Sequence, residues 1–214
     1  MNEKTKKITM IGMLAALSYL LMVVIRVPVV LFLKYEPKDV IITLGGFILG
    51  PLTSFVISVI VSVIEMVTVS DTGPIGCLMN LIATCSFACV ASFIYKKMHN
   101  LKGAVIGLLT GIVSMTSVML VWNYLITPIY LGYPREAVAD MLVPAFLPFN
   151  LLKGGINATI TMLVYKPLVT GLRKARLIPE SKGSQKGNQI GVMLVCFALL
   201  VTCIVTVLVW NGTI

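Results

Sequence analysis

Long apolar runs separated by short polar segments extend along the whole chain. Most of them approach the roughly 20 residues that an α-helix needs to cross about 30 Å of hydrocarbon. The pattern predicts seven helical segments, at residues 8–25, 39–49, 52–67, 75–95, 103–126, 148–172 and 190–210. We therefore expect an all-α integral membrane protein with a six-helix domain at 1–172, a linker at 173–189 and an additional transmembrane helix at 190–210.

Composition and charge agree with a membrane protein. Of the 214 residues, 58% are hydrophobic and 12% are charged, which is unusual for a soluble domain. Twelve of the 17 lysines and arginines fall in segments 4–7, 96–102 and 166–186. The positive-inside rule therefore predicts a multi-pass protein with its N-terminus and linker in the cytoplasm. The net charge of +9 then reflects topology, and no nucleic acid partner is expected.

The sequence does not carry the motifs of an enzyme. It has one histidine, His99, and its five cysteines lie in apolar runs without CxxC spacing, which argues against a metal site or a disulfide framework. It contains neither a P-loop nor a GxSxG nucleophile elbow. We therefore expect a non-enzymatic protein without a cofactor, which would need a partner to use ATP.

One basic residue, Lys153, lies inside an apolar run. Asn150, Asn157 and Thr161 lie on the same helical face, three residues before it and four and eight residues after it. An ammonium at bilayer depth costs about 2.5–3.5 kcal/mol on insertion scales. Lys153 is therefore expected to face a partner or a polar cavity.

A second polar face follows the run at 52–67 and ends in Glu65. The predicted topology brings Glu65, Asn80, Asn123, Asn150 and Lys153 to one depth near the outer side. A pocket of amides, one ammonium and nearby aromatic rings suits a neutral polar ligand with a flat ring.

Two questions stay open at this point. Lys153 and Glu65 could instead form a structural ion pair, with the asparagines joining helix to helix. The segment at 27–39 is predicted as a loop, and its part from Tyr35 to Asp39 is either a solvated connector or a lid over the pocket.

Several motifs together resemble a known family. They are a short basic N-terminus, a small-residue spacing at Gly12 and Ala16, a Gly-Pro break at 50–51, Asn123-Tyr124 before a proline- and tyrosine-rich segment, and the stretch PFNLLKG at 148–154. Over residues 1–172 the chain resembles the riboflavin-binding S components of energy-coupling factor (ECF) vitamin transporters. The stretch at 148–154 is the most specific part of this resemblance.

The resemblance implies a six-helix protein of the bacterial plasma membrane that captures riboflavin from outside for an ATP-driven importer. Its partners would be a membrane-embedded coupling protein and two cytoplasmic ATPases. Asn123, Asn150 and Lys153 would bond to the vitamin, the first outer loop would close over it, and Gly12 and Ala16 would face the coupling protein.

Combining the resemblance with the polar cluster gives a set of candidate substrate-binding residues. They are Tyr35, Asp39, Glu65, Asn80, Asn123, Asn150, Lys153 and Asn157. The seventh apolar run departs from the family's six-helix pattern. The alternatives are an S component for another vitamin, and a non-transporting membrane scaffold in which the Lys153 cluster is structural.

Overall fold

The computed structural model describes residues 2–30, 33–70 and 72–174, with residues 196–199, 201–203, 205–206 and 209 of the C-terminal segment. Helices make up nearly all of the part up to residue 174, which confirms the all-α prediction. The helices are α1 (Glu3–Val24), α2 (Lys38–Leu49), α3 (Pro51–Thr68), α4 (Gly73–Thr84), α5 (Val90–Met98), α6 (Leu101–Leu131), α7 (Arg135–Met141) and α8 (Leu147–Lys174). A two-stranded hairpin, β1 (Val27–Val30) and β2 (Leu33–Tyr35), joins α1 to α2.

Five helical segments in the described part of the chain are long and apolar enough to cross a membrane. They are Glu3–Val24, Pro51–Thr68, Gly73–Met98, Leu101–Leu131 and Arg135–Gly171. Two of them are longer than the individual helices because π-helical turns, Cys85–Cys89 and Leu142–Phe146, join α4 to α5 and α7 to α8. With the 12-residue α2 they give the six helical segments that the apolar pattern predicted.

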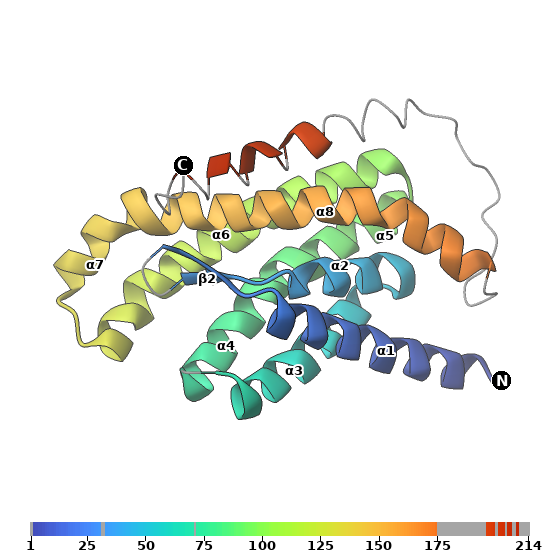
Figure 1. Cartoon of the computed structure of the whole chain (residues 1–214), viewed down its shortest axis with the longest axis horizontal. Helices are drawn as coiled ribbons and strands as arrows, with labels where there is room; N and C mark the ends of the chain where they lie inside the picture. The colour runs from blue at the N-terminus through green and yellow to red at the C-terminus, as the bar shows by residue number, and fades with distance from the viewer. Residues whose placement is uncertain are drawn as a thin grey trace.

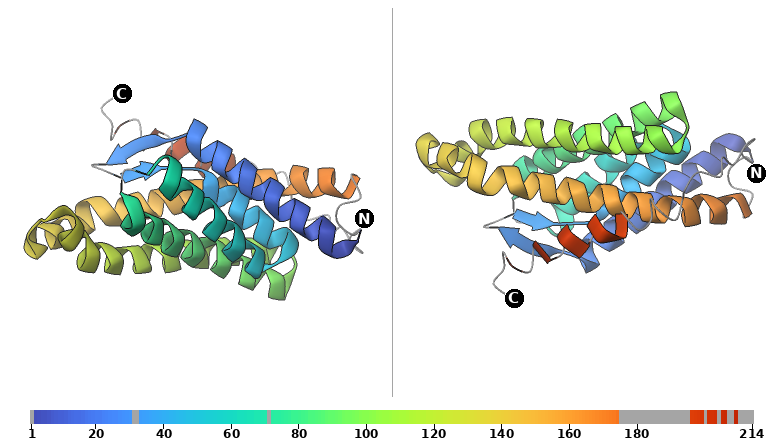
Figure 2. Two further views of the ribbon diagram at one scale, coloured as in Figure 1. Left: turned by 90° about the horizontal axis from the view of Figure 1, so that it is seen from below. Right: turned by 90° about the horizontal axis from the view of Figure 1, so that it is seen from above.

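The six segments run back and forth between two ends of an elongated bundle (Figure 1). The N-terminus, the α2–α3 turn, the α5–α6 turn and the end of α8 lie toward one end. The hairpin, the α3–α4 turn and the α6–α7 turn lie toward the other end, as the two further views confirm (Figure 2). We call the latter the hairpin end.

The turns between helices follow from local sequence. Gly50 has a φ of 100°, a conformation that favours glycine, and Pro51 follows at the first position of α3. The side chain of Asn100 accepts a hydrogen bond of 2.7 Å from the backbone N–H of Gly103, which caps the start of α6. These signals place the helix ends without tertiary contacts.

The short helix α2 lies in the centre of the bundle. Ten consecutive residues, Lys38 to Phe47, are buried, and α2 packs against α1, α3, α5 and α8. Its apolar residues join α3, α5 and α6 in the larger hydrophobic cluster. A helix that is buried on all sides has no lipid-facing stripe, so α2 organises the packing of its neighbours.

Helix α6 approaches the α4–α5 segment closely at two glycines. A Cβ at Gly107 would lie 2.6 Å from the carbonyl oxygen of Ala91, and one at Gly111 would lie 2.8 Å from that of Phe87. Both positions therefore require glycine, in keeping with the close helix packing that small residues allow in membranes.

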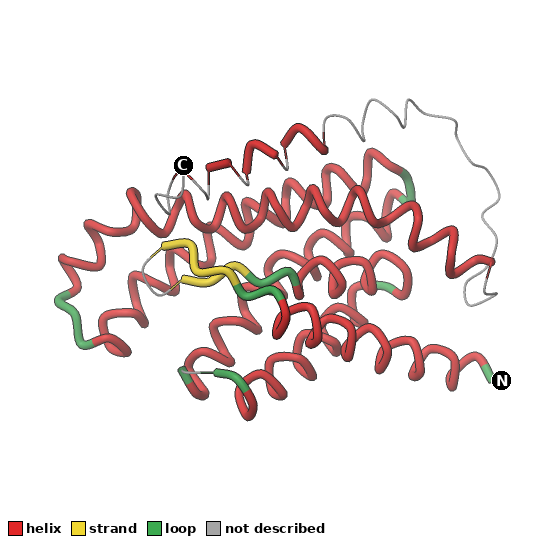
Figure 3. Tube along the Cα trace, in the orientation of Figure 1, coloured by secondary structure: helices red, strands yellow, loops and turns green. Residues whose placement is uncertain are grey.

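The segment at 27–39, expected as an irregular loop, is instead largely an antiparallel hairpin (Figure 3). Val27 pairs with Tyr35, and Pro28 with Lys34. The hairpin forms because Val29, Leu33 and Tyr35 bury their side chains in a second hydrophobic cluster with α7 and α8. The apolar patch within this segment was the signal for inward-facing strands.

The helices predicted at 103–126 and 148–172 imply a connecting loop at 128–145, and that prediction is wrong. Helix α6 continues through Pro128 to Leu131, and α7 begins at Arg135. The chain turns at Gly132, with a φ of 69°, and at Pro134. Pro128 lies in the last turn of α6 and removes one helical hydrogen bond, but the helix continues for three residues beyond it. The chain therefore turns at the glycine.

The predicted helix start near Pro148 is also wrong, because α7, the second π-helical turn and α8 run on from Arg135 without a break. Pro144 lies within this π-helical turn, and Pro148 follows as the second residue of α8. A π-helical turn accommodates a proline that would interrupt a regular α-helix.

The predicted linker at 173–189 lies outside the described residues except at its first two positions, which end α8. The predicted helix at 190–210 is described only in part, and those residues are helical. Phe197 and Val201 are exposed, whereas Cys203 packs against the second hydrophobic cluster. Its sulfur would lie 3.7 Å from a Cβ built at Gly155 on α8.

Candidate functional site

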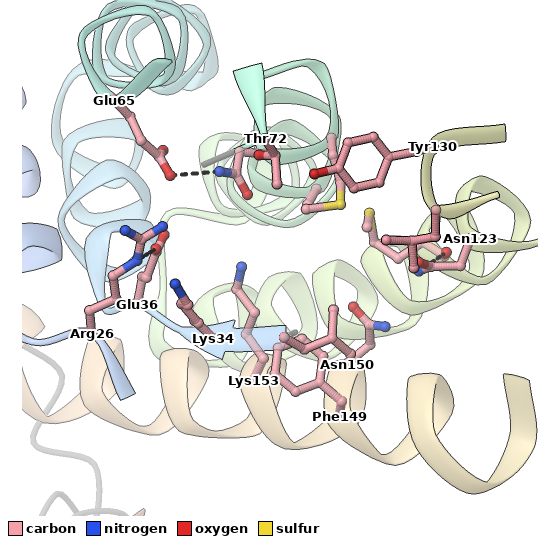
Figure 4. Close-up of a pocket in the computed structure, with 16 residues that line it drawn as sticks. Arg26, Lys34, Glu36, Glu65, Thr72, Asn123, Tyr130, Phe149, Asn150 and Lys153 are labelled. Atoms are coloured by element: carbon pink, nitrogen blue, oxygen red, sulfur yellow. Dashed lines mark hydrogen bonds and ion pairs between the residues drawn. The ribbon is translucent and has the colours of Figure 1, made fainter. Parts of the chain in front are cut away.

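A cavity of about 280 Å³, lined by both polar and apolar side chains, opens at the hairpin end, between the hairpin, α3, α4, α6 and α8. Its volume is near the lower limit of about 300 Å³ for small-molecule sites. Figure 4 shows side chains from these elements converging on the same space. The lining residues are Arg26, Leu33, Lys34, Glu36, Glu65, Thr72, Met79, Asn80, Ala83, Met119, Asn123, Tyr130, Leu131, Phe149, Asn150 and Lys153.

Five of the eight candidate substrate-binding residues line this cavity. They are Glu65, Asn80, Asn123, Asn150 and Lys153. The predicted shared depth therefore corresponds to a real cluster. The other three candidates, Tyr35, Asp39 and Asn157, are buried beside the cavity without lining it.

The polar face predicted for the last helix of the bundle is buried along its length. Asn150, Lys153, Asn157 and Thr161 are each at most 8% exposed. The helical spacing places the first two at the cavity and the next two deeper in the bundle, where Thr161 donates to the carbonyl of Asn157 at 2.6 Å.

Lys153 is paired, but the suggested pair with Glu65 is wrong. Its ammonium lies 3.5 Å from Oδ2 of Asp39, which is completely buried at the start of α2. Asp39 also accepts hydrogen bonds from Thr84 at 2.6 Å and from Asn157 at 3.2 Å. The carboxylate thereby joins α2, α4 and α8.

Glu65 instead belongs to a chain of charged groups along one wall of the cavity. Arg26 and Lys38 each lie 2.9 Å from Glu36, and Lys38 also pairs with Glu65. Glu65 accepts a further hydrogen bond of 2.8 Å from Asn80. The chain of charges links the hairpin to α3 and α4, as Figure 4 shows in part.

Sequence reasoning missed Lys38, which is only 1% exposed. It was assigned to the outer loop because it follows Pro37 and stands among charged residues. Its position next to the long apolar run of α2 was the available signal, but the burial itself depends on Glu36 and Glu65, and the latter is 27 residues away.

Tyr35 fixes the hairpin to α8. Its hydroxyl donates a hydrogen bond of 3.0 Å to Oδ1 of Asn157. Burial, together with the nearby negative charge of Asp39, raises the pKa of Tyr35 well above its ordinary value. The phenol therefore stays protonated and keeps donating throughout the physiological pH range.

Two asparagines in the lining keep hydrogen-bonding capacity. Asn123 donates to the carbonyl of Met119 at 2.7 Å and accepts from Thr127 at 2.9 Å. Asn150 donates to the carbonyl of Phe146 at 2.7 Å. Because a carboxamide has two donors and an acceptor with two lone pairs, each can bind a further polar group.

The cavity combines these polar groups with aromatic and aliphatic surface from Phe149, Tyr130, Met79 and Leu33. In the part of the chain that the structure describes, no group of three or more His, Cys, Asp and Glu side chains could hold a metal ion. The arrangement is suited to binding an uncharged molecule with both flat apolar and hydroxylated parts.

A membrane-spanning helical bundle with a polar, ligand-sized cavity at one end defines a solute-binding membrane protein. The chain belongs to the family of ECF transporter substrate-specific components, whose family model matches residues 6–165. This family consists of transport proteins, so the prediction of a non-enzymatic protein is confirmed.

The match to similar proteins extends over nearly the whole length of those proteins. Identity is 29% over 189 residues to the riboflavin transporter FmnP of Bacillus subtilis (strain 168), covering 81% of this chain and 99% of that protein. It is 32% over 205 residues to the riboflavin transporter RibU of Lactococcus lactis subsp. cremoris (strain MG1363), covering 82% and 97%.

A solved structure, described as "Structure and mechanism of the S component of a bacterial ECF transporter", has the same fold. It matches with a TM-score of 0.67 at 27% identity, covering 79% of this chain and 99% of that one. The family resemblance noted in the sequence is therefore confirmed.

Proposed function

We propose that this protein is the riboflavin-capturing S component of an ATP-driven ECF importer. The observation that carries the proposal is the cavity at the hairpin end, where Asn123, Asn150 and Lys153 meet the ring of Phe149. Further support comes from relatives named as riboflavin transporters, which the chain matches over almost their entire length.

The chemistry of the cavity fits riboflavin. The vitamin is uncharged, with a flat ring system and a hydroxylated tail. Phe149 and Tyr130 offer aromatic surface for the ring, while the Asn123 and Asn150 amides and the Lys153 ammonium offer donors and acceptors to carbonyl and hydroxyl groups. A cationic vitamin would find in Lys153 an ammonium that only donates and offers no counter-charge.

The hairpin end would face the outside of a bacterial plasma membrane. The lysines of segments 4–7 and 96–102 belong to the opposite end, where α1 begins and α5 meets α6. The positive-inside rule puts that end, and with it the N-terminus, in the cytoplasm. Riboflavin would then enter the cavity directly from the external medium.

Energy would come from a membrane-embedded coupling protein and two cytoplasmic ATPases. Gly12 and Ala16 are exposed on α1, and a Cβ at Gly12 would have no neighbour within 4 Å. This face would allow a helix of the coupling protein to approach closely, as small residues do between membrane helices.

The test is the absorption spectrum and flavin fluorescence of the purified full chain. Riboflavin that stays bound through purification would colour the protein yellow, and titration of the flavin-free protein would quench flavin fluorescence at one ligand per chain. Colourless protein that leaves flavin fluorescence unchanged would refute the assignment. Binding of another vitamin in its place would identify a different S component.

A further inference from the structure

Asp39 carries a buried carboxylate next to the cavity, but it is not one of the residues that line the cavity. Its Oδ2 lies 3.5 Å from the ammonium of Lys153, which does line the cavity. Asp39 therefore cannot act as a direct ligand contact in this structure, although it was a candidate for one. Its position calls for a role exerted through Lys153.

The surroundings of Asp39 fix the carboxylate in place. Oδ1 accepts from Thr84 on α4 at 2.6 Å, and Oδ2 accepts from Asn157 on α8 at 3.2 Å. Asn157 is in turn held by Tyr35 of the hairpin at 3.0 Å. Asp39 also lies in the first turn of α2, where the helix dipole favours a negative charge.

The charges around the cavity show what Asp39 contributes. Three carboxylates, Glu36, Asp39 and Glu65, are buried beside the cavity together with the cations Lys38 and Lys153. Glu36 bridges Arg26 and Lys38, and Glu65 pairs with Lys38. Asp39 supplies the counter-charge of Lys153. Loss of this carboxylate would leave a buried ammonium without a partner, which is strongly destabilising.

We propose that Asp39 is a positioning and specificity-determining residue that holds the Lys153 ammonium at the cavity wall and balances its charge. The inference rests on the proposed function. With Asp39 present, the Lys153 ammonium donates to an uncharged flavin while its own charge is balanced. Removing the carboxylate makes the surroundings of the cavity one charge more positive and shifts preference toward flavins that carry a negative charge.

The first test is Asp39→Asn in the full chain, titrated with riboflavin and with flavin mononucleotide, its phosphorylated form. Riboflavin affinity falls by about tenfold as Lys153 loses its anchor. Flavin mononucleotide is affected less, so its affinity relative to riboflavin rises by at least about threefold at low ionic strength. Thr84→Val is the matched control, because it removes a hydrogen bond to Asp39 without changing charge, and leaves the ratio unchanged.

Equal losses for the two flavins in Asp39→Asn, or the same ratio change in Thr84→Val, would overturn the specificity role. A purely structural role for Asp39 predicts equal losses, because a distorted cavity weakens both ligands alike.

The second test needs no ligand. Unfolding temperatures are compared for Asp39→Asn, Lys153→Met and the double variant. Because the double variant removes both charges together, it unfolds at a higher temperature than Asp39→Asn, and the two effects are not additive. If Asp39→Asn does not fold, recovery of folded protein in the double variant gives the same support. Additive effects, or an equally unfolded double variant, would overturn the positioning role.

The two tests separate this inference from the proposed function. A wild-type chain that binds neither flavin refutes the riboflavin assignment, and with it the specificity role of Asp39. The stability comparison still decides whether Asp39 holds Lys153.

Discussion

The two ends of the bundle bury different kinds of side chains. At the hairpin end, charged and amide side chains surround a cavity of about 280 Å³. At the opposite end, Phe47 stacks on Tyr95 with ring centroids 4.4 Å apart, and Tyr165 packs edge-on against both rings. The hydroxyls of Tyr95 and Tyr165 bond to each other.

This difference separates stability from recognition. The aromatic end satisfies its polar atoms internally and packs densely, which is how a core gains stability. The hairpin end keeps donors and acceptors that can meet a ligand. Substitutions at the two ends should therefore affect different measurements, and four variants test this from the largest expected effect to the smallest.

Phe47→Ala should have the largest effect, on stability. Loss of a buried aromatic side chain is expected to lower the free energy of unfolding by about 3–5 kcal/mol, seen as a lower unfolding temperature in detergent. Riboflavin affinity of the remaining folded protein should stay within about threefold, since the change is remote from the cavity. Phe55→Ala, at an exposed position on α3, is the control and should be nearly neutral.

Lys153→Met should have the largest effect on recognition. Hydrogen bonds to charged groups contribute about 1.5–3 kcal/mol, so riboflavin affinity should fall by roughly 10- to 100-fold in a fluorescence titration. The unfolding temperature should fall as well, because the buried carboxylate of Asp39 keeps its hydrogen bonds to Thr84 and Asn157 but loses its counter-charge. Unchanged affinity would remove Lys153 from the site; Lys102→Met, at an exposed position, serves as control.

Tyr95→Phe should have a smaller effect, again on stability. It removes the hydrogen bond to Tyr165 and keeps the stacking on Phe47, so the free energy of unfolding should fall by about 1 kcal/mol. Riboflavin affinity should not change, and Tyr133→Phe, which is exposed, should alter neither quantity. A loss of affinity in Tyr95→Phe would show that the two ends are coupled.

Arg26→Gln should have the smallest effect. The Arg26 side chain is 24% exposed where it pairs with Glu36 at 2.9 Å, and partly exposed ion pairs contribute about 0.2–1 kcal/mol. The difference in unfolding temperature from wild type should shrink as salt is raised, because salt screens exposed charges. A difference that persists at high salt would come from a buried ion pair or from the hydrogen bond of 3.1 Å that Arg26 donates to the carbonyl of Val69.

Sequence patterns predicted most of the fold because a membrane helix can be recognised from a local run of apolar residues. The apolar runs gave all six helical segments of the bundle, and Gly50 with Pro51 gave the turn between α2 and α3. The errors occurred at Pro128, which was placed in a loop after the predicted helix at 103–126, and at Pro148, which was predicted to begin a helix. A proline removes one helical hydrogen bond without always ending the helix, and a π-helical turn can accommodate it, so the residue type alone does not fix the helix boundary.

The cavity was predicted only in part, for a similar reason. Lys153 and Asn150 were found because they follow helical spacing within one apolar run. The partners of each charge were not, since Lys153 meets Asp39 across 114 positions of the chain and Glu65 meets Lys38 across 27. Which carboxylate neutralises which lysine depends on how helices cross, and no local pattern records that.

The shortness of α2 has a geometric consequence for the whole molecule. At 12 residues and 1.5 Å per residue it extends about 18 Å, whereas the hydrocarbon layer is about 30 Å thick. The central column of the bundle is thus only about three-fifths helix. The hairpin, whose Leu33 and Lys34 line the cavity, precedes α2 directly. The chain therefore completes this crossing with strands that carry cavity residues instead of with more helix.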